Sequence, residues 1–348
     1  MLILSDLNYE QLKKVITDMG ERSFRAEQIF RGVCSGKKIS EITDISKELR
    51  AKLLSVYEDE PVKIIGKKVS SVDGTTKYLF KLWDGNVVEG VLMKYKYGNT
   101  QCVSTQVGCR MGCAFCASGI DGLVRNLTAG EILGQISAVN AEIGGALDKR
   151  AVTNVVLMGS GEPLDNYDNV VAFIRNLSDK RGLNVSPRNL SLSTCGLVPK
   201  IYDLAGEGLD VNLTISLHNP FDEGRKLLMP IANAYSIAEI LDACSYYFNK
   251  TGRRYIFEYS LVRGQNDGKD CAEELIRLLK GRPCHINLIR LNEVKEKNLS
   301  STSDKDAYKF LGLLTKGGLS ATLRRQMGAD IDGACGQLRR KYINGENL

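Results

Sequence analysis

The chain has 348 residues, enough for one large domain with an appendage or for two domains. Apolar residues make up 43% of it, and no stretch approaches the ~20 apolar residues of a membrane span, which excludes an integral membrane protein built of helices. The formal charge of +6 permits a nucleic-acid partner without requiring one.

The first 60 residues predict an N-terminal helical accessory domain. Three amphipathic patterns follow one another: "SDLNYEQLKKVITDMG", "SFRAEQIFRGVCSG" and "DISKELRAKLLSVY". The opening residues have no basic segment, long apolar core or cleavage site, so no signal peptide is predicted and we expect a cytoplasmic protein.

Residues 61–95 differ in character and predict a small segment of β-hairpins. The stretch "VKIIGKKVSSVDGTTKYLFKLWDGNVVEGVLMKY" has β-rich runs separated by "DG" pairs, which favour tight turns between antiparallel strands. We expect this segment to link the helical domain to the rest of the chain.

Residues 96–348 predict a partial (β/α)6 barrel, an α/β fold. Short apolar runs alternate with helical patterns such as "TAGEILGQISAVNAEIG", and this order favours parallel strands joined by right-handed crossovers. Six units favour a partial barrel over a closed one of eight. The six runs are "CVSTQVG", "NVVLMG", "NLSLSTC", "VNLTISL", "YIFEYSLV" and "HINLIRL".

Three of the ten cysteines, Cys109, Cys113 and Cys116, follow the first barrel strand with C-x3-C-x2-C spacing. In a chain without an export signal, such a cluster favours metal binding or catalysis over disulfides. One interpretation is a zinc site completed by a remote Cys or His. The other is an iron–sulfur cluster held by three thiolates, with one iron open to a small molecule.

A second motif, "GSGEPL" at residues 159–164, follows the second strand and belongs to the same end of the sheet. Glycines let a backbone approach a ligand closely, and Glu162 can accept hydrogen bonds from an ammonium group. Together with the cysteine trio and Phe115, this motif resembles the radical S-adenosylmethionine (SAM) superfamily over roughly residues 101–295. That resemblance implies a [4Fe–4S] cluster on the three cysteines and SAM beside it.

Longer stretches narrow the resemblance. "CVSTQVGCRMGCAFC", "GEPLDN", "LSLSTCGLVPKI", "TISLHNP" and "ADIDGACGQL" are together similar to the RlmN family of RNA adenine methyltransferases, along nearly the whole chain. The resemblance implies methylation of carbon 2 of an adenosine in 23S rRNA and in tRNA. Carbon 2 is electron-poor, which is why a radical route is needed, and the cofactor supplies that chemistry.

The resemblance to this family also implies roles for two further cysteines and one glutamate. Gly333 and Gly336 flank Cys335 in a stretch without apolar periodicity, which predicts an exposed loop suited to a moving nucleophile. The resemblance implies that Cys335 carries the methyl group, and that Cys102 releases the RNA adduct by forming a disulfide with it. Glu89 is implied as the proton acceptor. Without the family, Glu89 is a strand-surface glutamate.

The resemblance also implies the SAM contacts, which lie at strand ends. They are Gly161, Glu162, Ser193, Ser216, Leu217, His218 and Asn292. Glu293 follows Asn292 where relatives often have proline, and Ser160 stands where many have methionine. The other interpretation of His218 is a structural histidine. Of the five remaining cysteines, Cys34, Cys244, Cys271 and Cys284 are expected to be buried thiols, and Cys195, at a strand end, is not assigned.

The partners implied are 23S rRNA and tRNA, gripped in part by the N-terminal domain, and an external electron donor such as flavodoxin. We expect a monomer without a membrane segment. Two alternatives stay open: the resistance-conferring relative that methylates carbon 8 of the same adenosine, and a non-catalytic iron–sulfur or zinc protein that binds RNA.

Overall fold

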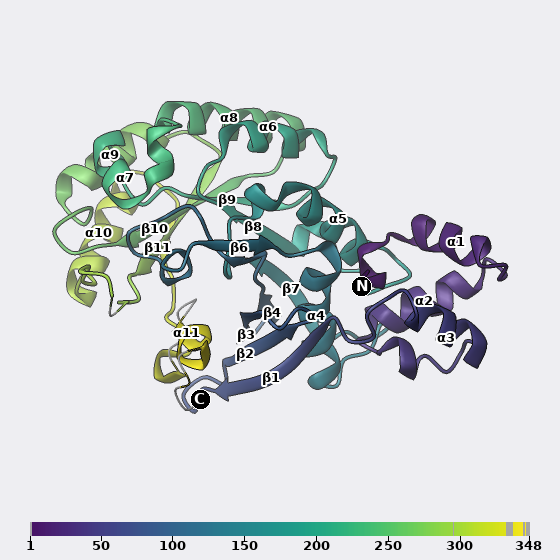
Figure 1. Cartoon of the computed structure of the whole chain (residues 1–348). Coiled ribbons are helices and arrows are strands. Elements are labelled where there is room, and N and C mark those ends of the chain that lie inside the picture. Colours follow the sequence, from purple (N-terminus) through teal and green to yellow (C-terminus); the bar gives the residue numbers. More distant parts are fainter. Residues whose placement is uncertain (1, 295, 332–336, 344, 346–348) are drawn as a thin grey trace.

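A ten-stranded sheet forms the centre of the molecule (Figure 1). The computed structural model describes residues 2–294, 296–331, 337–343 and 345. Strands neighbour one another in chain order, and only the short β5 and β6 form a separate pair. The order in the main sheet is β1-β2-β3-β4-β7-β8-β9-β10-β11-β12. The strands are β1 Val62–Val69, β2 Thr76–Leu82, β3 Val87–Tyr95, β4 Gly98–Cys102, β5 Gln106–Gly108, β6 Leu123–Asn126, β7 Val152–Leu157, β8 Leu190–Thr194, β9 Asn212–Ser216, β10 Tyr255–Leu261, β11 Cys284–Arg290 and β12 Ala321–Leu323.

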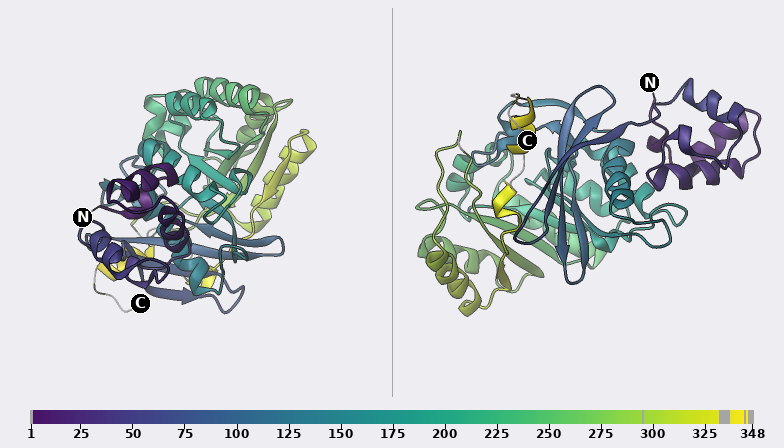
Figure 2. Two further views of the ribbon diagram at one scale, coloured as in Figure 1. Left: turned by 90° about the vertical axis from the view of Figure 1, so that its right-hand side faces the viewer. Right: turned by 90° about the horizontal axis from the view of Figure 1, so that it is seen from below.

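Three helices precede the sheet and lie together at one end of the molecule, as Figure 2 shows. They are α1 Tyr9–Asp18, α2 Arg25–Cys34 and α3 Lys47–Leu54. The Asn8 side chain accepts a hydrogen bond from the Gln11 backbone N–H at the start of α1, and Ser46 caps α3 in the same way. Such caps satisfy backbone N–H groups that have no partner within the helix. The helical region expected at the N-terminus is therefore present.

The first four strands form an antiparallel meander. Both "DG" pairs lie at its turns, where Gly74 and Gly85 have φ angles of 71° and 86°. Glycine adopts this left-handed conformation without steric cost, so the turn prediction is confirmed. The hairpins continue directly into the large sheet through β4, which pairs in parallel with β7.

The parallel strands from β4 to β12 form the partial barrel, and the predicted fold class is confirmed. Two details differ from the prediction. The run "CVSTQVG" does not form one strand, because residues 106–108 leave the main sheet and pair with β6. The short β12 adds a parallel strand after β11. The remaining helices are α4 Ala129–Glu142, α5 Tyr167–Ser178, α6 Val198–Gly206, α7 Asp222–Leu228, α8 Ile237–Thr251, α9 Lys269–Leu279, α10 Asp304–Lys316 and α11 Gln337–Ile343.

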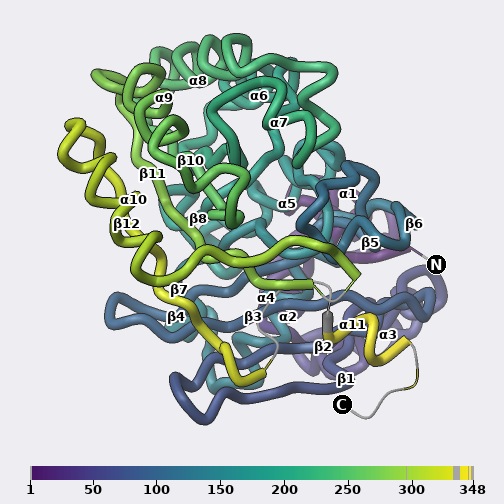
Figure 3. Tube along the Cα trace, turned by 90° about the vertical axis from the view of Figure 1, so that its left-hand side faces the viewer, coloured from purple at the N-terminus to yellow at the C-terminus, as the bar shows by residue number. Residues whose placement is uncertain are grey.

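Side chains alternate between the two faces of these strands. The face that belongs to the hydrophobic core carries fully buried residues such as Leu192, Leu213 and Phe257. The opposite face is polar, with Ser216 in register beside Glu258 on the next strand. Because parallel strands all run the same way, their carboxyl ends meet at one edge, and the loops there can form a site (Figure 3).

Buried cysteines outside the predicted site match expectation. Cys34, Cys244, Cys271 and Cys284 are each at most 6% exposed, as apolar-like thiols are. Within the described residues, no helix combines the length and apolar character needed to cross a bilayer.

Candidate active site

The cysteine loop, residues 109–116, leaves β5 and is fixed at both ends. The Cys109 N–H donates to the Gly122 carbonyl at 3.0 Å, and the Ala114 N–H donates to the carbonyl of Leu228 at the end of α7 at 2.8 Å. Cys113 packs in an apolar cluster with Cys195 at the end of β8 and with Leu228. The loop therefore lies over the carboxyl ends of β8 and β9.

The three thiols of the loop influence one another. Burial raises the pKa of Cys109 to about 11, with a smaller contribution from the negative charge of Cys116. Burial also raises the pKa of Cys113 strongly, helped by repulsion from Cys116 and Cys109. Three thiolates at this place therefore need a bound cation, which deprotonates coordinating thiols. Among the described residues, no set of three His, Cys, Asp or Glu side chains meets the geometry of a site for a single metal ion.

The glycine turn after β7 packs against the chain that precedes the cysteine loop. A Cβ atom at Gly161, whose φ is +108°, would lie 2.6 Å from the Gln106 Cβ, and one at Gly159 would lie 2.6 Å from the Val103 carbonyl oxygen. The next N–H, that of Glu162, donates to the Gln106 Oε1 at 2.8 Å. In this structure the glycines thus serve close protein packing, a role that the sequence analysis did not assign.

The Glu162 carboxylate joins two strand ends. It is 4% exposed and accepts hydrogen bonds from the Cys195 N–H at 2.7 Å and the Leu164 N–H at 3.0 Å. Burial raises its pKa, while these N–H groups act in the opposite direction. The side chains of Thr194 and Cys195 also donate to this carboxylate, so a ligand donor would share or replace one of these bonds.

The segment Ser216–His218 begins at the last residue of β9 and turns sharply, with φ of 57° at His218. The His218 Nδ1 accepts the Ser260 N–H at 2.9 Å, so the ring proton lies on Nε2. Burial lowers the pKa of His218 to about 3, which keeps the ring neutral. The ring of Phe115, from the cysteine loop, meets the imidazole edge-to-face with centroids 4.7 Å apart. The cysteine motif and the "SLH" motif are therefore in direct contact.

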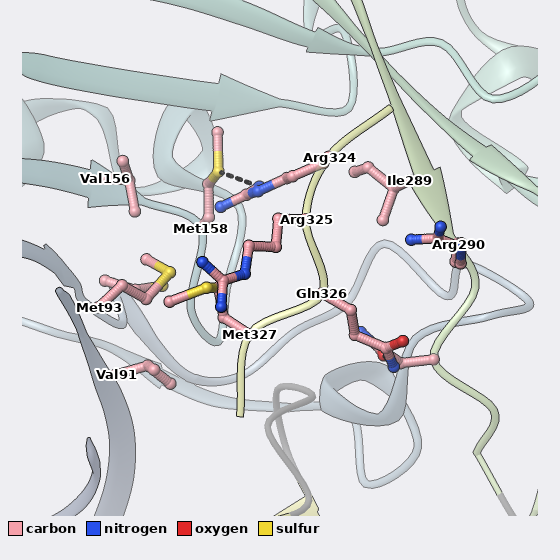
Figure 4. Close-up of a pocket in the computed structure, with 12 residues that line it drawn as sticks. Val91, Met93, Val156, Met158, Ile289, Arg290, Arg324, Arg325, Gln326 and Met327 are labelled. Atoms are coloured by element: carbon pink, nitrogen blue, oxygen red, sulfur yellow. Dashed lines mark hydrogen bonds between the residues drawn. The ribbon is translucent and has the colours of Figure 1, made fainter. Parts of the chain in front are cut away.

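A cavity of about 160 Å³ opens beside the polar face of the sheet (Figure 4). Cys102 and Asn292 both line it, so the structure places these two predicted residues in one cavity. Methionines and arginines form much of the rest, and Figure 4 shows Arg324 directed at the Met158 sulfur. The Asn292 Oδ1 accepts a hydrogen bond from Gln326 at 3.3 Å.

Glu89 is buried, 5% exposed, in contrast to the strand-surface position that the residues alone indicate. Its carboxylate forms an ion pair with the fully buried Lys77 at 3.3 Å and accepts the backbone N–H of Arg339 in α11. Along β3, Glu89 and Val91 share a face, and Val91 pairs with Cys102. Glu89 and Cys102 therefore belong to the same face of the sheet. Cys335 lies outside the described residues.

Comparisons with known proteins agree with this geometry. Residues 103–279 match the radical SAM superfamily, and residues 3–58 match the ribosomal RNA large subunit methyltransferase N-terminal domain. The chain is 53% identical over 345 residues to a protein of Clostridium perfringens strain SM101 named as a dual-specificity RNA methyltransferase RlmN, covering 99% of this chain and 98% of that protein. A Clostridium novyi protein of the same name is 51% identical over 336 residues, with 96% of each chain covered.

The chain belongs to the RlmN family.

A solved structure supports the assignment. A radical SAM methyltransferase from Sphaerobacter thermophilus superposes with a TM-score of 0.92 at 40% identity, covering 97% of this chain and 99% of that one. Membership of the RlmN family confirms the resemblance that the motifs indicated.

Several residues of this RlmN family site were not found from the sequence. Lys77 and Arg225 are both 0% exposed, although a charged side chain is ordinarily solvated. Arg339 is also buried. Only strand register and helix packing, which a single sequence does not give, bring them to the site. The predicted Ser193 lies on the polar face of β8 and is in register with Thr214 of β9.

Proposed function

We propose that this protein is a radical SAM methyltransferase that methylates carbon 2 of adenosine in 23S rRNA and in tRNA. The observation that carries the proposal is the similarity, over 99% of the chain, to a protein named as a dual-specificity RNA methyltransferase. The contact between the cysteine loop and the "SLH" motif supports it, because the proposed cluster and cofactor ligands then adjoin.

The donor set fits an iron–sulfur cluster. Cys109, Cys113 and Cys116 would hold it, since they are three thiols from one loop whose charged forms repel unless a cation is bound. When bound, a [4Fe–4S] cluster supplies the electron that cleaves SAM.

The proposed SAM site extends along the strand ends from Gly161 and Glu162 through Ser193 and Ser216 to Asn292. Glu162 would accept hydrogen bonds from the SAM ammonium group. Its carboxylate is buried, and a buried carboxylate forms strong hydrogen bonds with a cationic donor. Leu217 and His218 would contact the cofactor through their backbone and, for His218, through its neutral ring.

Cys102, Cys335 and Glu89 are proposed as the catalytic residues. Cys335 would carry the methyl group to carbon 2 of the adenine, and Cys102 would then form a disulfide with Cys335, which breaks the bond to the RNA product. Glu89 would accept the proton from carbon 2. Its carboxylate can take a proton while it keeps contacts to Lys77 and Arg339, because each oxygen has two acceptor positions.

The target adenine would enter the cavity that contains Cys102. An adenine that is stacked inside an RNA helix cannot reach such a cavity. The target base must therefore turn out of the helix. Arg325 is exposed at the cavity and provides positive charge for the RNA backbone. We further propose a cytoplasmic monomer that is reduced by an external donor such as flavodoxin. Residues 1–60 would be an accessory RNA-binding domain, residues 61–95 a β-hairpin linker that also contributes Glu89, and residues 96–348 the radical SAM part.

Mass spectrometry of RNA tests the proposal. Anaerobically purified protein with iron, SAM, a reductant and a 23S rRNA fragment or tRNA should yield an adenosine methylated at carbon 2. A product methylated at carbon 8 would instead assign the protein to the resistance-conferring relatives. RNA binding without any methylation or SAM cleavage would overturn the enzymatic proposal.

A further inference from the structure

Arg225 is a buried cation that the proposed function has not used. It lies in α7, and its side chain is 0% exposed. Its Nη2 donates to the carbonyl of Cys195 at 2.6 Å and to that of Ser216 at 3.4 Å. Its Nε and Nη1 are buried and have no hydrogen-bond partner among the described atoms.

Such an arrangement is costly, because a buried charge needs a partner of opposite charge. No carboxylate in the described part of the chain lies within ion-pair distance of Arg225. Of the two acids in its own helix, Glu223 pairs with Lys226 at 2.6 Å, and Asp222 accepts the Ile237 N–H at 2.8 Å while it attracts Arg225 only at longer range. The anion that Arg225 is built to face is therefore not a side-chain carboxylate described in this structure.

The position of Arg225 indicates what that anion is. Its helix follows the "SLH" segment, and the helix end receives the Ala114 N–H of the cysteine loop. The two sulfur atoms with which the guanidinium interacts electrostatically are those of Cys195 and Cys113. Of these, only Cys113 belongs to the cysteine trio.

We propose that Arg225 is the counter-charge of the cysteine loop and offsets the negative charge that three cluster-bound thiolates create. This inference rests on the proposed function, because it needs the cluster. A positive charge beside the cluster stabilises its reduced, more negative form. Arg225 thus makes the cluster easier to reduce, and acts as a positioning residue without touching the RNA.

A second anion, the methionyl carboxylate of SAM, has the same affinity for a guanidinium. The thiolates are favoured, because Cys113 packs against Cys195, whose carbonyl Arg225 bonds, and against Leu228 of the same helix as Arg225. The two sources separate experimentally, since the thiolates are present with or without SAM.

The test compares Arg225→Met and Arg225→Lys with wild type in the full-length protein. Each is reconstituted with iron and sulfide under anaerobic conditions, iron is quantified, and the reduced fraction is followed by EPR during potentiometric titration without SAM. We expect Arg225→Met to lower the midpoint potential, so that the ratio of reduced to oxidised cluster at fixed potential falls about tenfold, the equivalent of one charge-assisted hydrogen bond. The midpoint potential of Arg225→Lys should lie between those of Arg225→Met and wild type.

The matched control is Arg254→Met. Arg254 also donates to a strand carbonyl, that of Cys284 at 2.7 Å, but at the amino end of β11 and away from the cysteine loop. Its substitution should leave the midpoint unchanged. If Arg225→Met does not fold, the shift in Arg225→Lys, with circular dichroism as the check of folding, decides the question.

Three outcomes would count against the inference. A variant that loads iron normally and keeps the wild-type midpoint without SAM would overturn it. Weaker SAM binding at an unchanged midpoint would assign Arg225 to the SAM carboxylate instead. Wild-type protein that takes up no iron–sulfur cluster would overturn the proposed function itself, a result distinct from the other two.

Discussion

The Glu89 carboxylate accepts the backbone N–H of Arg339, a residue 250 positions later in the chain. Arg339 returns a second contact, because its Nε donates to the Val87 carbonyl at 2.8 Å. These bonds hold the start of α11 against β3, and Figures 1 and 3 both show α11 beside the hairpin strands. The segment that ends at α11 includes Cys335 in the sequence, so Glu89 links the hairpin strands to the chain that carries the proposed nucleophile.

The buried ion pair between Lys77 and Glu89 should contribute strongly to the stability of the fold. Lys77→Met leaves the Glu89 charge buried with its cationic partner removed, and breaking one side of a buried pair costs about 3–5 kcal/mol. We expect a corresponding fall in the free energy of unfolding, measured by chemical denaturation. The control is Lys67→Met, which removes a half-exposed pair with Glu142 and should cost only about 0–1 kcal/mol. Equal losses in both variants would refute the buried-pair argument.

His218 should make stability depend on pH. Its pKa is about 3 in the folded protein, lowered by burial, and near 6.5 when unfolded. The unfolded chain therefore binds the proton first as the pH falls. From about pH 7 to about pH 5 this linkage should remove about 2 kcal/mol of stability. Denaturation curves at several pH values for wild type and His218→Asn measure this contribution.

Asparagine suits this test because it tolerates the left-handed backbone at 218 and keeps an acceptor for the Ser260 N–H. His285 is the other histidine of the chain, is partly exposed and provides the control. His285→Asn should retain most of the pH dependence, and His218→Asn should lose most of it. The same slope in His218→Asn as in wild type would contradict the assignment.

Gly161→Ala should strain the turn that presents Glu162. The φ of +108° is unfavourable for any side chain, and the added Cβ would meet Gln106 at 2.6 Å. We expect a loss of about 1–3 kcal/mol of stability, together with weaker SAM binding. Gly312→Ala, in the open middle of α10, should instead add up to about 1 kcal/mol. Thermal melting compares the two, and an unchanged melting temperature for Gly161→Ala would show that the turn adapts.

The part of the site that the sequence predicts lies in continuous motifs at strand ends. Apolar runs define the parallel strands, and the carboxyl ends of such strands meet at one edge, so the cysteine trio, Glu162 and His218 are expected to be neighbours. The contact of Phe115 with His218 is of this kind. Local spacing and strand direction were sufficient for it.

The rest depends on register and packing, which a single sequence does not reveal. Glu89 is predicted to lie at the strand surface because a glutamate side chain is ordinarily solvated, whereas the structure covers it with α11. Arg225 stands next to Lys226 and two acids, a pattern typical of a solvated helix, yet α7 turns it inward. Both exceptions are charged residues buried at the site, where polar groups are held at a cost in stability.

Replacing Cys102 with alanine should trap the reaction before product release. Without the Cys102 thiolate, the proposed disulfide with Cys335 cannot form, so the bond between Cys335 and the RNA should persist. Protein purified from cells should then carry covalently attached RNA, seen as a retarded species in denaturing gels that nuclease removes, with the modified peptide mapped by mass spectrometry to Cys335. Cys284→Ala, a buried cysteine at the amino end of β11, should give no such species. Free RNA methylated at the normal rate by Cys102→Ala would remove Cys102 from the mechanism, and an adduct mapped to another residue would remove Cys335.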